Sequence, residues 1–454
     1  MDKYFKESTL TSIFEEKFSN QKSKGVDKIS AKKFNSNKKE YIKLIKRKCI
    51  DDSYNFSPYL EKLKVKGRDK FPRLISIPTF RDRIVLYVLK EILHEKFPYS
   101  MPKKQSNQYL SEIKETIGRG ESNYFFKTDI LKFYDEINRK KLMLLVSKKI
   151  KDQRILNLIS KAIKNPTVPA ESSRESRESF IREKGIPQGL AISNILAQIY
   201  LTSIDTYNSL QPYFYFRYVD DILILQKESI SIDIENNLAK ELKKIDLALN
   251  KKKTEFGKVS NGITFLGYRI EKAAISVSYQ NHQKIISRIA AKFTWFKDKF
   301  YNIKKRPEWI KDNDDRIIEV FMDELNELIT GAKKGDKRYG WLYYFSEITD
   351  ISLLYKLDKI VERFFAELDM FGFKKPKRVK RFVRAFYEIR YKNGGNYIQD
   401  YNLHDTIAKK RDFLIFRGAI SSTVAYTNKE IEKSYKNYTI RRLRNIRIKT
   451  NYSY

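Results

Sequence analysis

The sequence predicts an α+β fold followed by a mainly helical region. Residues 123–270 alternate short β-rich runs with helical patterns, and from about residue 282 onward apolar residues recur at helical spacing. The chain has 454 residues, of which 41% are hydrophobic. It can therefore bury a sizeable core and form roughly two to four packed units.

The expected elements follow in order along the chain. A β-rich segment at 73–78 precedes an apolar-patterned helix at 84–89. A strand over 125–129 turns into a helix, and two β-rich runs within 213–225 flank an Asp pair. The polar stretch 171–179 indicates an exposed loop, with a modification or regulatory site as the alternative.

In the second half, two sets of apolar residues each fall on one helix face, which indicates core packing rather than a cofactor site. These are Ile317, Phe321, Leu325 and Leu328, and then Leu353, Leu357, Ile360, Phe364 and Leu368. Two basic stretches follow: Lys374–Arg384 holds seven Lys or Arg among eleven residues, and Arg441–Lys449 adds five.

The charge balance favours a nucleic-acid partner. The chain carries 92 Lys+Arg against 56 Asp+Glu, a formal charge of +36, together with 30 Tyr and 29 Phe. Basic side chains neutralise phosphates and aromatic rings stack on bases, although a merely soluble basic protein is the alternative. The first basic stretch is a candidate nucleic-acid contact, against the alternative of a solvated helix face. Its proposed contacts are Lys374, Lys375, Lys377, Arg378, Lys380 and Arg381.

Several classes of site and location are disfavoured. The single cysteine, Cys49, excludes an intramolecular disulfide, and three scattered histidines do not suit a metal site. No apolar run reaches the ~18 residues of a membrane span, and no signal-peptide pattern is present. We therefore expect a soluble, cytoplasmic protein without a membrane partner.

Three aspartates stand out beside apolar strands. Asp129 closes one predicted strand, and Asp220 and Asp221 lie between two others. Clustered carboxylates repel one another unless a cation neutralises them, and two Mg²⁺ ions ~3.5–4 Å apart can activate a hydroxyl and grip phosphates. An Asp pair that merely caps a turn is the alternative.

The motifs around these aspartates resemble the reverse transcriptase family. Tyr218-Val-Asp-Asp221 is similar to its Tyr-x-Asp-Asp signature, and Gly185-Ile-Pro-Gln-Gly189 to its Pro-Gln-Gly motif. Six motifs in family order span roughly residues 55–270. They are Arg73–Pro78 with Arg81–Arg83, Asp129 with Phe133 and Tyr134, Gly185–Ala197, Tyr218–Asp221, Leu249–Thr254 and Phe265–Tyr268.

The resemblance implies a right-hand polymerase. The expected parts are an N-terminal region with fingers at 1–122, a palm with an antiparallel sheet and inserted fingers elements at 123–275, a helical thumb at 276–370, and a basic, mainly helical extension at 371–454. Gly340-Trp-Leu-Tyr-Tyr-Phe345 resembles a thumb motif of bacterial members.

The resemblance to reverse transcriptases also implies the reaction and the metal ligands. An RNA-directed DNA polymerase would add dNTPs to a 3′-hydroxyl on an RNA template with two Mg²⁺ ions, for which Mn²⁺ could substitute. Asp129 and Asp220 are the first candidates for metal ligands, Asp221 is their neighbour, and Ile130 belongs to the same set.

The remaining site residues come from the same resemblance. Arg73 would bind the triphosphate, and Lys70 is a second candidate that could equally be solvated. Tyr134 occupies the steric-gate position that disfavours ribonucleotides, unless it is an ordinary core tyrosine. Gln188 and Gly189 would approach the template–nucleotide pair. The primer-grip hairpin would contact nucleic acid through Phe265, Leu266, Gly267 and Tyr268.

Departures from the common patterns favour one subgroup. Leu190 and Asn194 stand where group II intron enzymes usually carry Gly and Pro. The chain looks most like the defence-associated, abortive-infection group of bacterial enzymes. That likeness implies antiphage defence with a dedicated noncoding RNA, or with untemplated or protein-primed synthesis. Tyr452 and Tyr454 are hydroxyl candidates for protein priming.

Three alternatives remain. They are an intron or retroelement enzyme, an RNA polymerase, and a non-catalytic RNA-binding protein on the same scaffold. Besides the template, the product and dNTPs, a companion defence protein or a second copy of the chain is a candidate partner.

Overall fold

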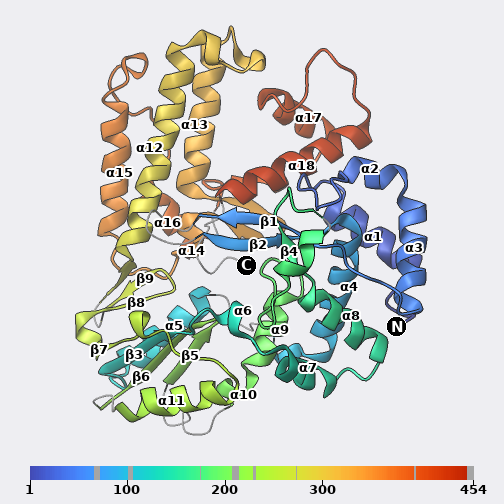
Figure 1. Ribbon diagram of the computed structural model, residues 1–454. Coiled ribbons are helices and arrows are strands. Elements are labelled where there is room, and N and C mark those ends of the chain that lie inside the picture. Colours follow the sequence, from blue (N-terminus) through green and yellow to red (C-terminus); the bar gives the residue numbers. More distant parts are fainter. Residues whose placement is uncertain are drawn as a thin grey trace. The chain divides into compact units, whose positions relative to one another are not determined.

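The structure is a computed structural model (Figure 1), and it divides into two compact units. The first comprises residues 1–103 and 122–257, and the second comprises 104–121 and 258–453. Both contain helices and antiparallel strands, so the predicted α+β class is confirmed. The domain limits at 122, 275 and 370 stay predictions. The described residues are 1–65, 72–100, 106–173, 175–206, 214–228, 232–271, 274–392 and 395–446.

The main sheet of the first unit has four strands in the order β5-β6-β3-β7. Strand β3 pairs antiparallel with β6, which in turn pairs antiparallel with β5. All four residues from Ile222 to Leu225 are buried, so both faces of β6 are covered. The strands are β3 (Tyr124–Asp129), β5 (Phe214–Tyr218), β6 (Asp221–Gln226) and β7 (Glu255–Lys258).

Helices pack around helix α4 (Phe80–Lys96), which contacts α1, α3, α8 and α9. Their apolar faces belong to one continuous core that also includes residues of β3 and β6. The other helices of this unit are α1 (Glu7–Ile13), η1 (Phe14–Phe18), α2 (Ala31–Ser36), α3 (Lys38–Ile50), η2 (Pro98–Ser100), α6 (Phe133–Glu136), α7 (Arg139–Ser147), α8 (Gln153–Lys164), η3 (Glu175–Phe180), α9 (Ser193–Tyr200), α10 (Thr202–Asp205), α11 (Ile232–Lys244) and η5 (Lys251–Lys253).

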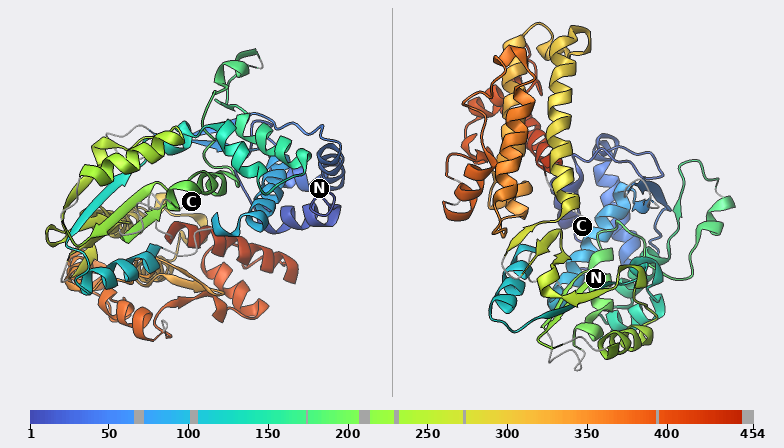
Figure 2. Two further views of the ribbon diagram at one scale, coloured as in Figure 1. Left: turned by 90° about the horizontal axis from the view of Figure 1, so that it is seen from below. Right: turned by 90° about the vertical axis from the view of Figure 1, so that its left-hand side faces the viewer.

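A smaller sheet of order β2-β1-β4 completes this unit. It consists of β1 (Tyr59–Lys64), β2 (Arg73–Ile77) and β4 (Thr167–Val168). The strand expected at 73–78 and the helix expected at 84–89 are therefore confirmed. In the polar stretch 171–179 the described residues are exposed except Ser172, Ser176 and Arg177, which are half-buried, and Figure 2 shows η3 projecting from the body of its unit.

In the second unit, helices α12, α13 and α15 run alongside one another (Figures 1 and 2). The predicted apolar stripe on α13 is buried throughout. On α15, Leu353 and Leu357 are buried, whereas Ile360 and Phe364 are half-buried and Leu368 follows the end of the helix. The long helices are α12 (Tyr279–Tyr301), α13 (Asp314–Thr330) and α15 (Ser352–Phe365).

The rest of this unit consists of shorter elements and the C-terminal helix α18. None of the helices that the structure describes has the length and apolar content needed to span a membrane. Helix α18 spans Asn428–Ile446, and the shorter elements are α5 (Ser106–Gly118), η6 (Val259–Asn261), β8 (Ile263–Phe265), β9 (Tyr268–Ile270), β10 (Ile275–Val277), η7 (Ile303–Lys305), η8 (Glu308–Ile310), β11 (Ala332–Lys334), β12 (Lys337–Tyr339), α14 (Trp341–Tyr344), η9 (Asp369–Phe371), α16 (Phe382–Tyr391), β13 (Gln399–Asp400), η10 (Tyr401–Leu403) and α17 (Ile407–Phe416).

Candidate active site

The hairpin between β5 and β6 carries two of the three aspartates. Tyr218 and Asp221 are Cα partners, so Val219 and Asp220 form the two-residue turn. Val219 has a φ of 60°, a left-handed conformation that costs energy for a β-branched residue. The sequence predicted that the Asp pair would occupy the turn, but Asp221 already belongs to β6.

Strand β3 brings the third aspartate to the same place. Asp129 is the last residue of β3 and the Cα partner of Asp221. Residues directly opposite each other on antiparallel strands project to the same face of a sheet. The backbone N–H of Ile130 donates to the carbonyl oxygen of Asp220 at 3.1 Å, which ties the turn to the end of β3. The fold therefore collects all three predicted carboxylates at one edge of the sheet.

The electrostatics of this cluster show crowded negative charge. Burial raises the pKa of Asp220 above its usual range, and the neighbouring charge of Asp129 raises it further. The positive charges of Lys253 and Arg73 act in the opposite direction. The carboxylates are thus poised to gain stability from a cation.

Lys253 supplies such a cation, and sequence reasoning assigned it no role. Its ammonium forms an ion pair with the Asp129 carboxylate. Burial lowers the pKa of Lys253, but the hydrogen bond and charge of Asp129, with the charges of the other two aspartates, raise it above the usual value. The only sequence signal was its place in the Leu249–Thr254 motif.

Backbone contacts position Lys253. The N–H of Asn250 donates to the carbonyl oxygen of Asp129 at 2.8 Å. The hydroxyls of Thr128 and Thr254 lie 2.9 Å apart, on the two sides of the same junction. The short helix η5 is thereby attached to the end of β3.

Arg217 is a second residue that sequence reasoning missed. Its Nη1 donates to the carbonyl oxygen of Val219 and to Oε1 of Gln198, both at 2.8 Å. Its Nε donates to Oδ1 of Asp205 at 2.6 Å. Arg217 therefore clamps the turn that presents Asp220. No sequence motif distinguished it from other arginines of this basic chain.

A cavity of about 470 Å³ contains two of the predicted nucleotide-binding residues. Arg73, on β2, and Gln188, in the loop before α9, both line it. Lys132, Arg139 and Arg182 add positive charge, and Asp135 and Glu136 add negative charge. Lys70 lies outside the described residues, so its role stays a prediction.

The 185–189 loop is held between α6 and β2. The backbone N–H of Ile186 donates to the carbonyl oxygen of Tyr134 at 2.8 Å, and the backbone N–H of Ser76 donates to the carbonyl oxygen of Gln188 at 2.7 Å. Gly189 has a φ of 103°, and a Cβ there would lie 2.8 Å from Cγ2 of Ile75. The glycine is thus required by close approach to β2, while its predicted contact with template stays a prediction.

Tyr134 lies on α6, and its side chain is buried beside Phe133, with ring centroids 5.4 Å apart. This position fits a packed core residue. Its predicted role in sugar discrimination is not tested by the packing and stays a prediction.

The predicted primer-grip hairpin forms in the second unit. Leu266 and Gly267 both have positive φ and connect β8 to β9. Phe265, Leu266 and Tyr268 are buried. The Tyr344 hydroxyl donates to the carbonyl oxygen of Leu266. The carbonyl oxygen of Gly267 accepts from the Ser278 backbone N–H and the Asn281 side chain. The nucleic-acid role of these four residues stays a prediction, and their buried side chains would not stack on bases.

The six predicted basic contacts divide into three pairs. Lys374 and Lys377 are exposed. Lys375 and Lys380 are half-buried and donate to the carbonyl oxygens of Val379 and Tyr397. Arg378 and Arg381 form ion pairs at 3.5 Å with Glu319 and Asp358. Helix α16 begins only at Phe382, so this stretch is a loop rather than a helix face.

The donor set at the sheet edge suits a hard divalent cation, because Mg²⁺ prefers carboxylate oxygens. Within the described ranges, no three His, Cys, Asp or Glu side chains are arranged as a ready metal cage. The Lys253 ammonium instead lies against Asp129. The carboxylates of Asp129, Asp220 and Asp221 are suitable ligands for Mg²⁺ when the Lys253 ammonium moves away from Asp129.

The family described as reverse transcriptase (RNA-dependent DNA polymerase) matches residues 64–270. This range contains β2, the 185–189 loop and all three aspartates. The matched range lies in the part of the chain that combines helices with antiparallel strands, in agreement with the expected α+β class.

Two curated proteins are similar to this chain. Protein YkfC from Escherichia coli (strain K12) is 25% identical over 300 residues, which cover 54% of this chain and 75% of YkfC. Group II intron-encoded protein LtrA from Lactococcus lactis subsp. cremoris is 30% identical over 176 residues, which cover 37% of this chain and 28% of LtrA. Among solved structures, telomerase from Candida albicans in complex with a telomeric RNA fragment aligns with 89% of this chain and 68% of its own, at 14% identity and a TM-score of 0.41.

Proposed function

We propose that this chain, whose residues 64–270 are a reverse transcriptase domain, copies RNA into DNA at the Asp129–Asp220–Asp221 cluster. The enzyme class, RNA-directed DNA polymerase, agrees with the family match and with the LtrA relative. The observation that carries the proposal is the pairing of Asp129 with Asp221 beside the Asp220 turn. An Asp pair that merely capped a turn would need no third carboxylate opposite it.

Asp129, Asp220 and Asp221 would hold two Mg²⁺ ions, with Ile130 beside them. When bound, the ions lower the cost of bringing a 3′-oxygen and a triphosphate together and stabilise the leaving pyrophosphate. Asp129 must first release the Lys253 ammonium. That side chain is 57% exposed, so it can move into solvent without opening the core.

The cavity that contains Arg73 and Gln188 is the proposed nucleotide position. A guanidinium can donate two parallel hydrogen bonds to phosphate oxygens, and no ion pair occupies Arg73 in the described part of the chain. Arg73 is also close enough to Asp220 for its charge to lower the pKa of that carboxyl. A triphosphate on Arg73 would therefore lie beside the carboxylates.

Primer extension tests this proposal directly. The full-length chain should extend a DNA primer on an RNA template with Mg²⁺ and dNTPs, and Arg73→Ala should raise the KM for dNTP more than it lowers kcat. Tyr134→Ala should increase ribonucleotide incorporation if this ring limits space at the sugar. Normal extension by a folded Asp220→Asn/Asp221→Asn protein would refute the active-site assignment.

We further propose a role in bacterial antiphage defence, with a dedicated noncoding RNA or unconventional DNA synthesis. Leu190 and Asn194 support this subgroup. The similarity to LtrA supports a second candidate, an intron or retroelement enzyme. Sequencing the RNA and DNA that copurify from the native host separates the two: intron RNA would favour the second, and one abundant noncoding RNA or untemplated DNA the first.

A further inference from the structure

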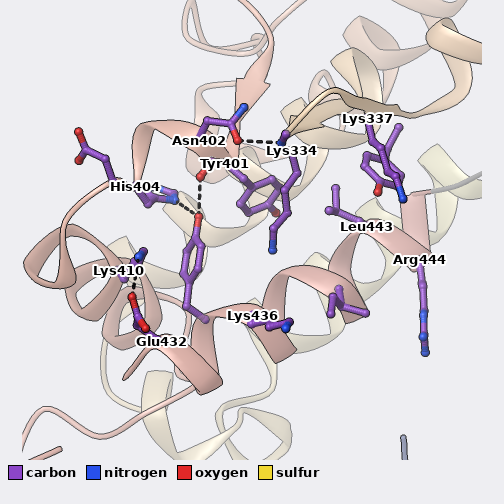
Figure 3. A pocket seen from close by; sticks show the side chains of 15 residues that line it. Lys334, Lys337, Tyr401, Asn402, His404, Lys410, Glu432, Lys436, Leu443 and Arg444 are labelled. Atoms are coloured by element: carbon purple, nitrogen blue, oxygen red, sulfur yellow. Dashed lines mark hydrogen bonds and ion pairs between the residues drawn. The ribbon is translucent and has the colours of Figure 1, made fainter. Parts of the chain in front are cut away.

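A cavity in the second unit is lined by residues 334–444, none of which belongs to the aspartate cluster. It has a volume of about 800 Å³ and lies between the β11–β12 hairpin, the 401–405 segment, α17 and α18. Five cationic side chains line it, and Figure 3 shows that they come from both sides of the cavity. They are Lys334, Lys337, Lys410, Lys436 and Arg444.

The carboxylates of the cavity do not balance these cations. Asp405 and Glu432 are the lining acids. Asp405 forms an ion pair with Lys409 at 2.9 Å, and Glu432 forms one with Lys410 at 3.4 Å. Among the described residues, Lys337, Lys436 and Arg444 form no ion pair. Positive charge is therefore in excess inside a concave space.

Lys334 shows the consequence of this excess. It is half-buried, and its Nζ donates to the Thr439 hydroxyl. Burial lowers the pKa of Lys334 to about 8, and the charges of Lys436 and Lys410 contribute to the decrease. An anion in the cavity would relieve this repulsion and favour the protonated lysine.

The cavity wall is held by buried contacts. The Tyr435 hydroxyl donates to the carbonyl oxygen of Tyr401 at 2.8 Å and lies 2.7 Å from Nδ1 of His404. The Tyr401 hydroxyl donates to Glu327 at 2.6 Å, and Nε of Arg442 bonds the same carboxylate at 2.5 Å. Helix α18 is thus anchored to α13 through Glu327, so the wall that carries Lys436 and Arg444 is held in place before a ligand binds.

We propose that this cavity binds the polyphosphate group of a phosphorylated ligand. The ligand would be either a free nucleotide or the 5′-triphosphate end of an RNA. A triphosphate concentrates several negative charges in a small volume, which suits five cations gathered around one open cavity. A nucleic-acid backbone carries one charge per nucleotide and is better matched by an extended basic track.

Calorimetry on the full-length chain tests the site. Inorganic triphosphate and ATP would be titrated in EDTA into protein that carries Arg73→Ala, which removes the proposed nucleotide position of the first unit. Lys436→Glu should weaken binding about tenfold or more, because it reverses a charge at the cavity. Lys433→Glu is the matched control, since Lys433 is an exposed residue of α18 that does not line the cavity.

Two further measurements complete the test. Binding near pH 8 should take up protons, seen as a dependence of the binding heat on the ionisation enthalpy of the buffer, and Lys334→Met should abolish most of that uptake.

A short RNA with a 5′-triphosphate should bind more tightly than the same RNA with a 5′-hydroxyl if RNA ends are the ligand, whereas binding of ATP alone would indicate free nucleotides. The proposal is overturned by absence of triphosphate binding, or by equal weakening in Lys436→Glu and Lys433→Glu. Neither result depends on whether the chain synthesises DNA.

Discussion

Asp129 and Asp221 face each other across β3 and β6, as Cα partners of an antiparallel pair. Like charges directly opposite in a sheet are destabilising, so this arrangement needs a counterion. In the structure, the Lys253 ammonium fills that role at Asp129. If the cluster binds the proposed metal ions, they must compete with Lys253 for Asp129, which would not occur at an inert turn.

The variant Asp220→Asn should lose catalytic activity without losing its folded structure. Burial and the charge of Asp129 make ionised Asp220 unfavourable, so Asp220→Asn should keep or slightly raise the melting temperature. It should abolish DNA synthesis, while RNA binding in a gel-shift assay stays near that of the wild type. Measurable primer extension by the folded variant would contradict the assignment.

The parts of the site that sequence could predict are those encoded by short, local patterns. The β3 strand, the β5–β6 hairpin and helix α4 each follow from contiguous apolar periodicity. Asp129 and Asp220 were identified because the strands around them are apolar. The pairing of Asp129 with Asp221, 92 positions further along the chain, was implied only by the family resemblance, since no local rule fixes which strands become neighbours.

The parts that could not be predicted depend on distant partners. Arg217 matters because Asp205 and the Val219 carbonyl converge on it, and nothing in its own segment indicates this. The primer-grip residues illustrate the reverse case. The motif identifies the hairpin correctly, but Tyr268 is buried against Tyr344 and Phe345, which lie about 76 residues further along the chain.

Removing the Lys253 ammonium should strengthen metal binding. In Lys253→Met, Asp129 loses its counterion, so the melting temperature in EDTA should fall, and the Mg²⁺ concentration that restores it should also fall. We expect a change of about two- to fivefold, because a partly exposed ion pair is worth up to ~1 kcal/mol. Thermal unfolding over a Mg²⁺ titration measures both effects. Lys251→Met, an exposed neighbour, is the control, and an identical response of the two variants would contradict the competition.

Arg217→Ala should lower both stability and activity. The Arg217 side chain is 8% exposed, so its loss removes the ion pair with Asp205 and leaves the Val219 carbonyl without this donor, at a cost of about 1–3 kcal/mol in the free energy of unfolding. Urea unfolding measures that cost. The double variant Arg217→Ala/Asp205→Ala should recover part of the stability but not the rate of nucleotide addition, because the Val219 carbonyl still lacks its donor. Full recovery of the rate would show that the clamp does not position Asp220.

A last prediction concerns the pH dependence of the free energy of unfolding and the buried carboxylate of Asp82. Asp82 is fully buried and accepts hydrogen bonds from Thr79 and Tyr54 at 2.7 and 2.8 Å. Burial raises the pKa of Asp82 to about 6 despite these bonds. The folded state therefore retains a proton that the unfolded state releases near pH 4, so this stability is present below that pH and is lost as the pH rises through 6.

Asp82→Asn mimics the protonated form and should remove this dependence. The difference in the free energy of unfolding between Asp82→Asn and the wild type should move in favour of the variant by about 2–3 kcal/mol from pH 4 to pH 7. Denaturant unfolding at several pH values measures it. A change in hydrogen bonding at the new amide would add an offset that is equal at every pH, so only the slope is diagnostic. A difference that stays constant between pH 4 and pH 7 would show that Asp82 remains ionised in the folded protein.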